Sequence, residues 1–491
     1  MRLLSRIDRA LNVFDKPGVV LIFLLPVFFQ WIAPLAHSRF WLDETVTWWT
    51  TNHGLRELIT RCTFWPGSIL YNSLILLLRS LGVHREWMLR VPSLVAVALS
   101  AMLLFDLARR WFSPRVAIAA SVFFCTQQWI MFAAADARPY GLGLLTVVAA
   151  TWLMLRWLET QRMAEACTYG ITAALMLHFH MLFATVLVFH AAYLAVTMPR
   201  HRQAARQAAM AVFILAALAL PLLPQYLFAF TGRGAHTFSN PRTLWDLGRQ
   251  FLPGLPLVAA AAIAALLPRL QPAERARIEN KFVLLALLWA AVPMFLLFIA
   301  AKLSGSDLFV GRYLIPYVPG IALCFGMVLE YLSTRLRTGL VLLIFLIPNA
   351  ISVFQGQFPS HTAWGNWAAA IEFVDKENRT SGMPVLMRSP FPESDFFAWR
   401  TEKMDDSALY APLGFYRSPG DWHPLPVTLN SDAEYLIGNL SSGKTALFFV
   451  SREDDLVPDP YIAYLSGLAR PSGEFRQVAD FEGVRVFRLR R

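Results

Sequence analysis

The stretch Phe282-Val-Leu-Leu-Ala-Leu-Leu-Trp-Ala-Ala-Val-Pro-Met-Phe-Leu-Leu-Phe-Ile-Ala-Ala301 contains no charged residue. A helix of about 20 apolar residues is long enough to cross the hydrocarbon core of a bilayer. The whole chain of 491 residues has this character, because 56% of its residues are hydrophobic and only 16% are charged. This composition predicts a polytopic membrane protein. It excludes a disordered chain, a collagen, a disulfide-stabilised miniprotein and an ordinary cytosolic enzyme.

Eleven apolar segments of this kind occur along the chain. The first follows a basic stretch with Arg2, Arg6 and Lys16, and we interpret it as an uncleaved anchor because many more spans follow. The apolar run around His178-Phe-His180 is too long for one span, so we divide it into two. The predicted spans are Val19–Ala36, Met88–Ala108, Val116–Ala133, Tyr140–Trp157, Thr168–Phe179, Leu182–Met198, Ala209–Phe230, Phe251–Pro268, Phe282–Ala301, Tyr313–Tyr331 and Gly339–Phe354.

A further apolar segment, Ser68–Leu81, is short for a span. If it lies along the membrane surface, the basic loops from Arg109 to Arg337 all fall on the side of the N-terminus, as the excess of Lys and Arg in cytoplasmic loops favours. We therefore predict an inner-membrane protein with a cytoplasmic N-terminus. The formal net charge of +11 is then explained by loops that face the cytoplasm and anionic lipid, and no nucleic-acid partner is expected.

The composition changes near residue 355. Charged and turn-forming residues become frequent, an amphipathic helix is predicted over Trp364–Lys376, and short strands are predicted over Met383–Met387, Ala446–Val450 and Val484–Leu489. The sequence thus predicts a transmembrane module over residues 1–355, with an outer first loop over residues 37–87, and a small soluble α/β domain over residues 356–491. Eleven spans from a cytoplasmic N-terminus place this domain in the periplasm.

Acidic residues lie where two predicted outer loops begin. Asp43 and Glu44 follow the first span, and Asp136 stands in the very short second outer loop, two residues before Arg138. Ionisable groups at such positions are costly and indicate a functional site by default. Structural interpretations are also open: Asp43 could cap a helix, Glu44 could interact favourably with the dipole of the first helical turn, and Asp136 could form an ion pair with Arg138.

Other polar candidates are an arginine and two histidines. Arg312 begins a predicted span on the outer side, where it either extends toward the lipid headgroups or binds a phosphate through its guanidinium. His178 and His180 occupy a tight outer turn, and each alone is more often structural than a ligand. Together with the acidic residues they could supply a divalent-cation site, but ligands from separate loops give no spacing that tests this.

An ordered set of motifs resembles the GT-C membrane glycosyltransferases of the dolichyl-phosphate-mannose–protein mannosyltransferase kind, which include bacterial lipid A aminoarabinose transferases and glycosyltransferase families 39 and 83. The set consists of Asp43-Glu44, Leu89-Arg90-Val91-Pro92-Ser93, Ala137-Arg138-Pro139-Tyr140 and Arg312-Tyr313-Leu314-Ile315-Pro316. The resemblance covers residues 14–354. One motif departs from it, because Trp65-Pro66-Gly67 stands where many relatives carry a charged residue or histidine followed by Pro-Pro or Pro-Leu.

The resemblance implies a GT-C fold of about eleven transmembrane helices. It also implies a hexosyl- or pentosyltransferase that takes a sugar from a polyprenyl-phosphate donor. Carried over by motif, Asp43 is the catalytic carboxylate, with Glu44 and Asp136 beside it. Arg138 and Arg312 bind the donor phosphate, and Tyr140, Tyr313, His178 and His180 support the site.

The expected partners are the lipid-linked donor, the bilayer, and an envelope lipid, glycan or protein as acceptor. No cofactor is certain. A transporter or flippase of lipid-linked sugars is the alternative, since it would also have many spans and buried charges. A non-enzymatic scaffold, in which the outer domain is the functional part, is a further possibility. Against the transporter, the ionisable residues gather at the outer ends of the spans and no two halves of the chain match.

Overall fold

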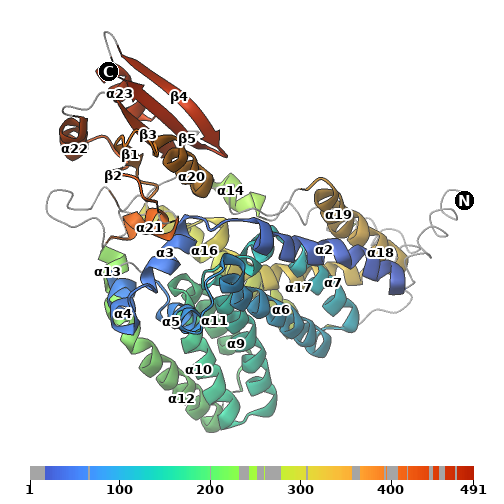
Figure 1. Cartoon of the computed structure of the whole chain (residues 1–491). Helices are drawn as coiled ribbons and strands as arrows, with labels where there is room; N and C mark the ends of the chain where they lie inside the picture. The colour runs from blue at the N-terminus through green and yellow to red at the C-terminus, as the bar shows by residue number, and fades with distance from the viewer. Residues whose placement is uncertain are drawn as a thin grey trace, which may run out of the picture.

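The protein consists of a large helical module and a smaller sheet-containing domain formed by the C-terminal part of the chain (Figure 1). The computed structural model describes residues 17–64, 67–199, 201–231, 243–250, 259, 262, 278–305, 308–356, 365–391, 394, 407–416, 418–441, 446–452, 459–469 and 473–490. The predicted span Phe251–Pro268 lies almost entirely outside these residues.

Apolar sequence forms the helices of the large module, and most of the predicted segments correspond to a helix or a pair of helices. The elements are α2 (Pro17–His37), α3 (Leu42–Thr50), α4 (Leu55–Phe64), α5 (Ile69–Ser80), α6 (Glu86–Trp111), α7 (Pro114–Cys125), α8 (Gln128–Ala134), α9 (Tyr140–Thr160), α10 (Met163–Phe179), η2 (Met181–Phe183), α11 (Ala184–Thr197), α12 (Arg202–Ala219), η3 (Leu220–Leu222), α13 (Leu223–Thr231), α14 (Leu244–Arg249), α16 (Asn280–Ser304), η7 (Gly311–Tyr313), η8 (Ile315–Tyr317), α17 (Val318–Glu330), α18 (Thr334–Val341), η9 (Leu342–Leu346) and α19 (Ile347–Phe354).

Five continuous helical stretches among the described residues are long and apolar enough to cross a membrane, and six if the bent pair α7 and α8 forms one span. The predicted span Val116–Ala133 is therefore not straight, because α7 and α8 meet at a bend of 69°. α10 ends at Phe179 and a 3-10 turn precedes α11, so the chain breaks at His180 as predicted. α5 has 12 residues and is too short for a straight crossing. The count of eleven spans remains a prediction.

The long helices pack side by side, and this packing puts the ends of α6 in different surroundings. α6 packs against α7 and α9, while α10 packs against α9 and α12. With a rise of about 1.5 Å per residue, the 26 residues of α6 separate Arg90 near its start from Arg109 and Arg110 at its end. The basic turn that follows α6 therefore lies far from the N-terminal end of α6, which is the end near α3.

The C-terminal domain is an α/β unit, as the sequence predicts, and its helices and sheet form three layers. Its strands β1 (Val385–Arg388), β2 (Trp422–Leu425), β3 (Ala446–Arg452), β4 (Glu474–Phe481) and β5 (Val484–Arg490) form one sheet in the order β2-β1-β3-β5-β4. β1 pairs in parallel with β2 and β3, and β5 pairs antiparallel with β3 and β4. The strands β2 and β4 were not predicted, because β2 contains Pro424 and β4 is largely polar and exposed.

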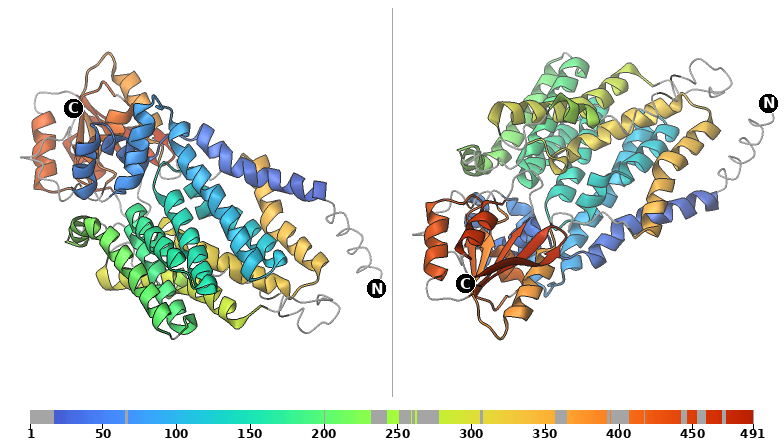
Figure 2. Two further views of the ribbon diagram at one scale, coloured as in Figure 1. Left: turned by 90° about the horizontal axis from the view of Figure 1, so that it is seen from below. Right: turned by 90° about the horizontal axis from the view of Figure 1, so that it is seen from above.

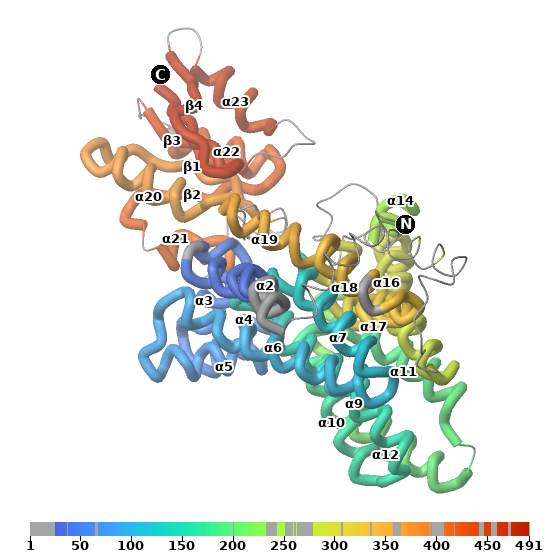
Figure 3. The backbone as a smooth tube through the Cα atoms, turned by 90° about the vertical axis from the view of Figure 1, so that its right-hand side faces the viewer, coloured from blue at the N-terminus to red at the C-terminus, as the bar shows by residue number. Residues whose placement is uncertain are grey.

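Both faces of this sheet are covered, because the strands are apolar on both sides. Val385 and Phe448 on one face belong to a cluster with residues of α20 (Trp367–Asn378), η13 (Ala408–Tyr410) and α21 (Ala411–Tyr416). Leu386 and Phe449 on the other face pack with α22 (Ser431–Ser441) and α23 (Pro460–Leu468). Figures 1 and 3 show α20 and α21 between the sheet and the helical module, and α21 packs against α3. Figure 2 shows the long helices of the module side by side from below and from above.

Candidate active site

Asp43 lies in the first turn of α3, directly after the first apolar helix. Trp41, not Asp43, occupies the N-cap position, and its backbone N–H donates to the Glu44 carboxylate at 3.1 Å. The interpretation of Asp43 as a helix cap is therefore wrong, because the helix begins one residue before it. The Asp43 side chain is 23% exposed and so remains accessible to a substrate.

Two arginines face the Asp43 carboxylate. The Nη2 atom of Arg138 lies 4.0 Å from Oδ2 of Asp43, and the Nη2 atom of Arg312 lies 3.9 Å from the same oxygen. These distances are longer than a hydrogen bond. Arg138 instead donates from Nη1 to the backbone carbonyl of Asp43 at 3.1 Å. The structure thus brings together three of the predicted site residues from segments up to 269 residues apart, with the carboxylate held near two cations but not hydrogen-bonded to either of them.

The position of Arg312 follows from the turn that carries it. Its guanidinium lies over the Trp41 ring at 5.5 Å and over the Tyr313 ring at 5.3 Å, distances typical of cation–π contacts. A Cβ atom at Gly311 would lie 1.7 Å from the Trp129 ring, so only glycine allows this tight approach of the backbone. The Arg312 side chain is only 10% exposed, which limits the directions in which its guanidinium can point.

Glu44 is completely buried in a hydrogen-bonded ion pair. Arg90 donates from Nε to Oε1 at 2.7 Å and from Nη2 to Oε2 at 2.5 Å. The backbone N–H of Ala137 also donates to Oε1 at 2.7 Å. Because Glu44 accepts from the start of α3, from α6 and from the loop before α9, it joins the loop after α2 to the loop before α9. This geometry favours a positioning role for Glu44 over contact with a substrate.

Asp136 is also fully buried, and it receives a hydrogen bond from the indole N–H of Trp41 at 3.0 Å. Burial, and after it the nearby negative charge of Glu44, raises the pKa of Asp136 well above the usual range of a carboxyl group. The proton-bearing form is therefore more favoured at Asp136 than in a carboxyl group exposed to water. The indole ring that donates to Asp136 is also the ring over which the Arg312 guanidinium lies.

The predicted supporting residues divide into two groups. The rings of Tyr140, His180 and Tyr313 contact one another, with the His180 ring 5.2 Å from Tyr140 and 5.4 Å from Tyr313. Desolvation, together with the charges of Arg138 and Arg312, lowers the pKa of His180 to about 3, so its imidazole is neutral. The His178 side chain is oriented elsewhere, since its Nε2 lies 2.9 Å from the carbonyl of Leu218. Both histidines line a small polar cleft with Arg138, Asn72 and Gln225.

No group of three or more His, Cys, Asp or Glu side chains arranged to hold a metal ion occurs in the described part of the chain. The two histidines hydrogen-bond to backbone groups, His180 through Nδ1 to the N–H of Leu182. They do not join Asp43 in a ligand set.

Sequence reasoning did not assign a role to Arg90 or Trp41, although both are central to the cluster. The signal for Arg90 was present: it lies inside the predicted span Met88–Ala108, where a cation needs a partner. Its partner could not be read from the sequence, because Glu44 is 46 residues away. Trp41 adjoins Asp43 in the sequence and is a residue type that suits the membrane interface or a sugar face. Its hydrogen bond to Asp136 could not be read from the sequence, because the two residues are 95 positions apart.

The helical module and the C-terminal sheet domain together form the GT-C fold, which is the fold that the resemblance in the motifs implies. Residues 67–225, less than half of the chain, match the family model of dolichyl-phosphate-mannose-protein mannosyltransferases. No curated protein matches the chain.

Two solved structures of one protein are similar over nearly the whole chain. ArnT from Cupriavidus metallidurans in the apo state superposes with a TM-score of 0.58 at 13% sequence identity, covering 96% of this chain and 98% of ArnT. The same protein bound to undecaprenyl phosphate superposes with a TM-score of 0.57 at 14% identity and the same coverage. At these identities the similarity establishes the fold.

Proposed function

We propose that the protein is an integral-membrane glycosyltransferase that moves a sugar from a polyprenyl-phosphate donor to an acceptor of the cell envelope at the outer face of the inner membrane. The observation that carries the proposal is the accessible Asp43 carboxylate facing the guanidinium groups of Arg138 and Arg312 at about 4 Å in a GT-C fold. A carboxylate and two cations are the groups that transfer from a lipid phosphate requires.

The proposed reaction assigns a different task to each charge. Asp43 accepts the proton of the acceptor hydroxyl as its oxygen forms a bond to the anomeric carbon of the sugar. The bond between the sugar and the phosphate breaks, and the departing phosphate keeps the electron pair. Arg138 and Arg312 stabilise this negative charge by charge-assisted hydrogen bonds. A phosphate is a good leaving group, so no general acid is needed.

The net charge of the cluster supports an anionic ligand. Arg90 is neutralised by Glu44, and the raised pKa of Asp136 favours its uncharged form. Arg138 and Arg312 then face Asp43 as the one remaining carboxylate of the predicted set. Among these six described residues, with Asp136 uncharged, the balance leaves one positive charge in excess, which suits a phosphate monoester or diester at this position.

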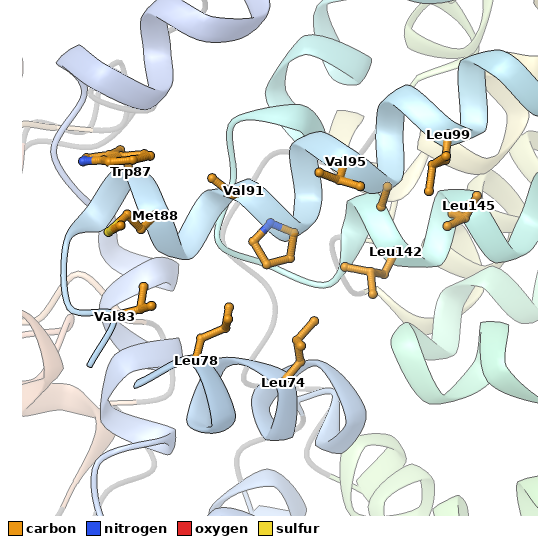
Figure 4. Close-up of a pocket in the computed structure, with 12 residues that line it drawn as sticks. Leu74, Leu78, Val83, Trp87, Met88, Val91, Val95, Leu99, Leu142 and Leu145 are labelled. Carbon is orange, nitrogen blue, oxygen red and sulfur yellow. The ribbon is translucent and has the colours of Figure 1, made fainter. Parts of the chain in front are cut away.

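An apolar groove next to the cluster suits the tail of such a donor. It lies between α5, α6 and α9, has a volume of about 500 Å³, and is lined by side chains such as Leu74, Val95 and Leu142 (Figure 4). Pro92 also lines this groove, and the next residue, Ser93, donates its hydroxyl to the carbonyl of Arg138 at 3.2 Å. This contact places the groove beside the backbone of Arg138, and we propose that the groove holds the isoprenoid chain of the donor.

The direct test is transfer by the purified protein in lipid vesicles. With a radiolabelled polyprenyl-phosphate sugar and envelope extract, a glycosyltransferase places the label in a new glycosidic bond, which mass spectrometry identifies. A transporter of lipid-linked sugars would instead move the label across the bilayer without forming a new bond. This second outcome would overturn the proposal.

Arg312→Ala is expected to raise the Michaelis constant for the lipid donor by about 10- to 150-fold. This range corresponds to the loss of a charge-assisted hydrogen bond of roughly 1.5–3 kcal/mol. Arg138→Ala should act in the same direction. Arg476→Ala, which removes an exposed arginine of the C-terminal domain, serves as the control. Unchanged donor constants in both Arg138→Ala and Arg312→Ala would assign these two residues a purely structural role.

A C-terminal alkaline phosphatase fusion is expected to be active, and a C-terminal GFP fusion is expected to be dark. The reason is the predicted topology, in which the basic loops lie on the cytoplasmic side and the C-terminal domain lies outside. Expression of both fusions in a Gram-negative host measures this directly. A fluorescent GFP fusion with an inactive phosphatase fusion would place Asp43 on the cytoplasmic side and contradict the proposed outer-face reaction.

A further inference from the structure

Helix α3 belongs to two parts of the molecule at once. Asp43, Glu44 and Thr47 lie on the side that faces the helical module, where Thr47 donates its hydroxyl to the carbonyl of Ala137 at 3.1 Å. Leu42 and Val46 lie on the opposite side and are buried, with 6% and 3% exposure. These two residues belong to the hydrophobic core of the C-terminal domain.

The core that Leu42 and Val46 complete is built by segments more than 300 residues later in the chain. It includes Trp367 and Ile371 of α20 and Leu413 of α21. A helix in the loop after the first span thus supplies part of the apolar surface that covers one face of the C-terminal sheet. Separating the domain from α3 would expose this surface to water, at a cost proportional to the apolar area.

Aromatic and polar contacts at the end of α21 fix the same junction. The Phe415 ring stacks on the Phe40 ring with centroids 5.0 Å apart and meets the Trp48 ring edge-on at 5.6 Å. The Tyr416 hydroxyl donates to the carbonyl of Phe40 at 2.8 Å. Both ends of α3 are therefore held by α21, Phe40 before its first turn and Trp48 near its last.

We propose that the C-terminal domain positions the catalytic helix: by packing against Leu42, Val46 and Trp48, it holds α3 so that the Asp43 carboxylate stays about 4 Å from Arg138 and Arg312 without hydrogen-bonding to them. This inference rests on the proposed role of Asp43. A small shift of α3 toward the helical module would let Asp43 form direct hydrogen bonds with the arginines. It would then be a poorer proton acceptor, and the arginines would be less available to a phosphate.

The test is a pair of matched leucine substitutions in the C-terminal domain of the full-length protein. Leu413→Ala removes a buried side chain of the cluster that contains Leu42 and Val46. Leu465→Ala removes a buried side chain of α23, on the other face of the sheet. Leu413→Ala is expected to lower kcat by about 10- to 100-fold, the range for misplacement of a catalytic group by about 1 Å. Leu465→Ala should leave kcat within twofold of the wild type.

Tyr416→Phe is the milder variant if Leu413→Ala does not accumulate in the membrane. It removes one hydroxyl, keeps the ring, and should lower kcat several-fold. Phe415→Leu should retain more activity than Phe415→Ala, since a large apolar side chain still fills the space between Phe40 and Trp48. Rates are measured per folded protein, quantified by size-exclusion chromatography of a fluorescent fusion.

Two results would overturn the inference. One is an equal loss of kcat in Leu413→Ala and Leu465→Ala, which would indicate only general destabilisation of the domain. The other is wild-type kcat in both Leu413→Ala and Tyr416→Phe. In the Asp43→Asn background, Leu413→Ala should have no further effect on the residual rate, because the group it misplaces is already absent. If Asp43→Asn itself retains activity, the proposed function of Asp43 fails first, independently of the leucine pair.

Discussion

Asp43→Asn is expected to lower the rate of sugar transfer by about 10²- to 10⁴-fold, the usual range for loss of a general base. Asparagine keeps the size of the side chain but cannot accept a proton at neutral pH. Asp43 is in the first turn of α3 and not at its N-cap, so the substitution removes no cap from the helix. Expression in the membrane should remain normal. The rate is measured with the purified variant and a labelled polyprenyl-phosphate sugar.

Two other Asp→Asn substitutions make this experiment specific. Asp106→Asn is the matched control and should not change the rate of sugar transfer. Asp106 lies near the C-terminal end of α6, away from Asp43, and pairs there with Arg109. Asp136→Asn should cost less than Asp43→Asn, because a carboxyl group that already favours its protonated form resembles an amide. Near wild-type turnover in Asp43→Asn would contradict the assignment of the general base to Asp43.

Arg90→Met is expected to destabilise the protein by about 3–5 kcal/mol. Removal of one partner of a buried ion pair leaves the other charge in a low-dielectric environment without compensation. Glu44 has no exposed surface, and Arg90 provides two of its hydrogen bonds. The expected result is a large fall in the midpoint of thermal unfolding in detergent, or failure to accumulate in the membrane.

A double variant and a surface control separate this effect from simple loss of contacts. Glu44→Gln combined with Arg90→Met removes both charges, and the single amide oxygen of the new glutamine can still accept from one of the two N–H groups that Trp41 and Ala137 present, so stability should partly recover. Arg110→Met breaks the exposed pair with Glu159 and should cost no more than about 1 kcal/mol. An equal fall in the midpoint of thermal unfolding in Arg90→Met and Arg110→Met would contradict a special contribution of the buried pair to the stability of the loops after α2 and before α9.

Asp43 and Glu44 are adjacent in the sequence but have different surroundings in the structure. The sequence placed Asp43 and Glu44 together after the first span, and their residue types could not distinguish them. In the structure they differ by the rotation of one helical residue, which directs Glu44 into the buried pair with Arg90 and leaves Asp43 beside Arg138 and Arg312. The interpretation that Asp136 pairs with Arg138 also relied on residues that are close in sequence. In the structure Asp136 accepts a hydrogen bond from the indole N–H of Trp41, 95 residues away.

The sequence by itself determined the class of protein, the positions of most apolar helices, the break at His180 and the α/β character of the C-terminal domain. These features depend on hydrophobicity and on short-range pattern, which are properties of contiguous residues. Only the tertiary structure decided that α3 completes the core of a domain formed 300 residues later, and that Arg90 is the partner of Glu44. These features depend on which helix faces meet, because a buried charge or an exposed apolar face indicates that a partner is needed, but not which residue supplies it.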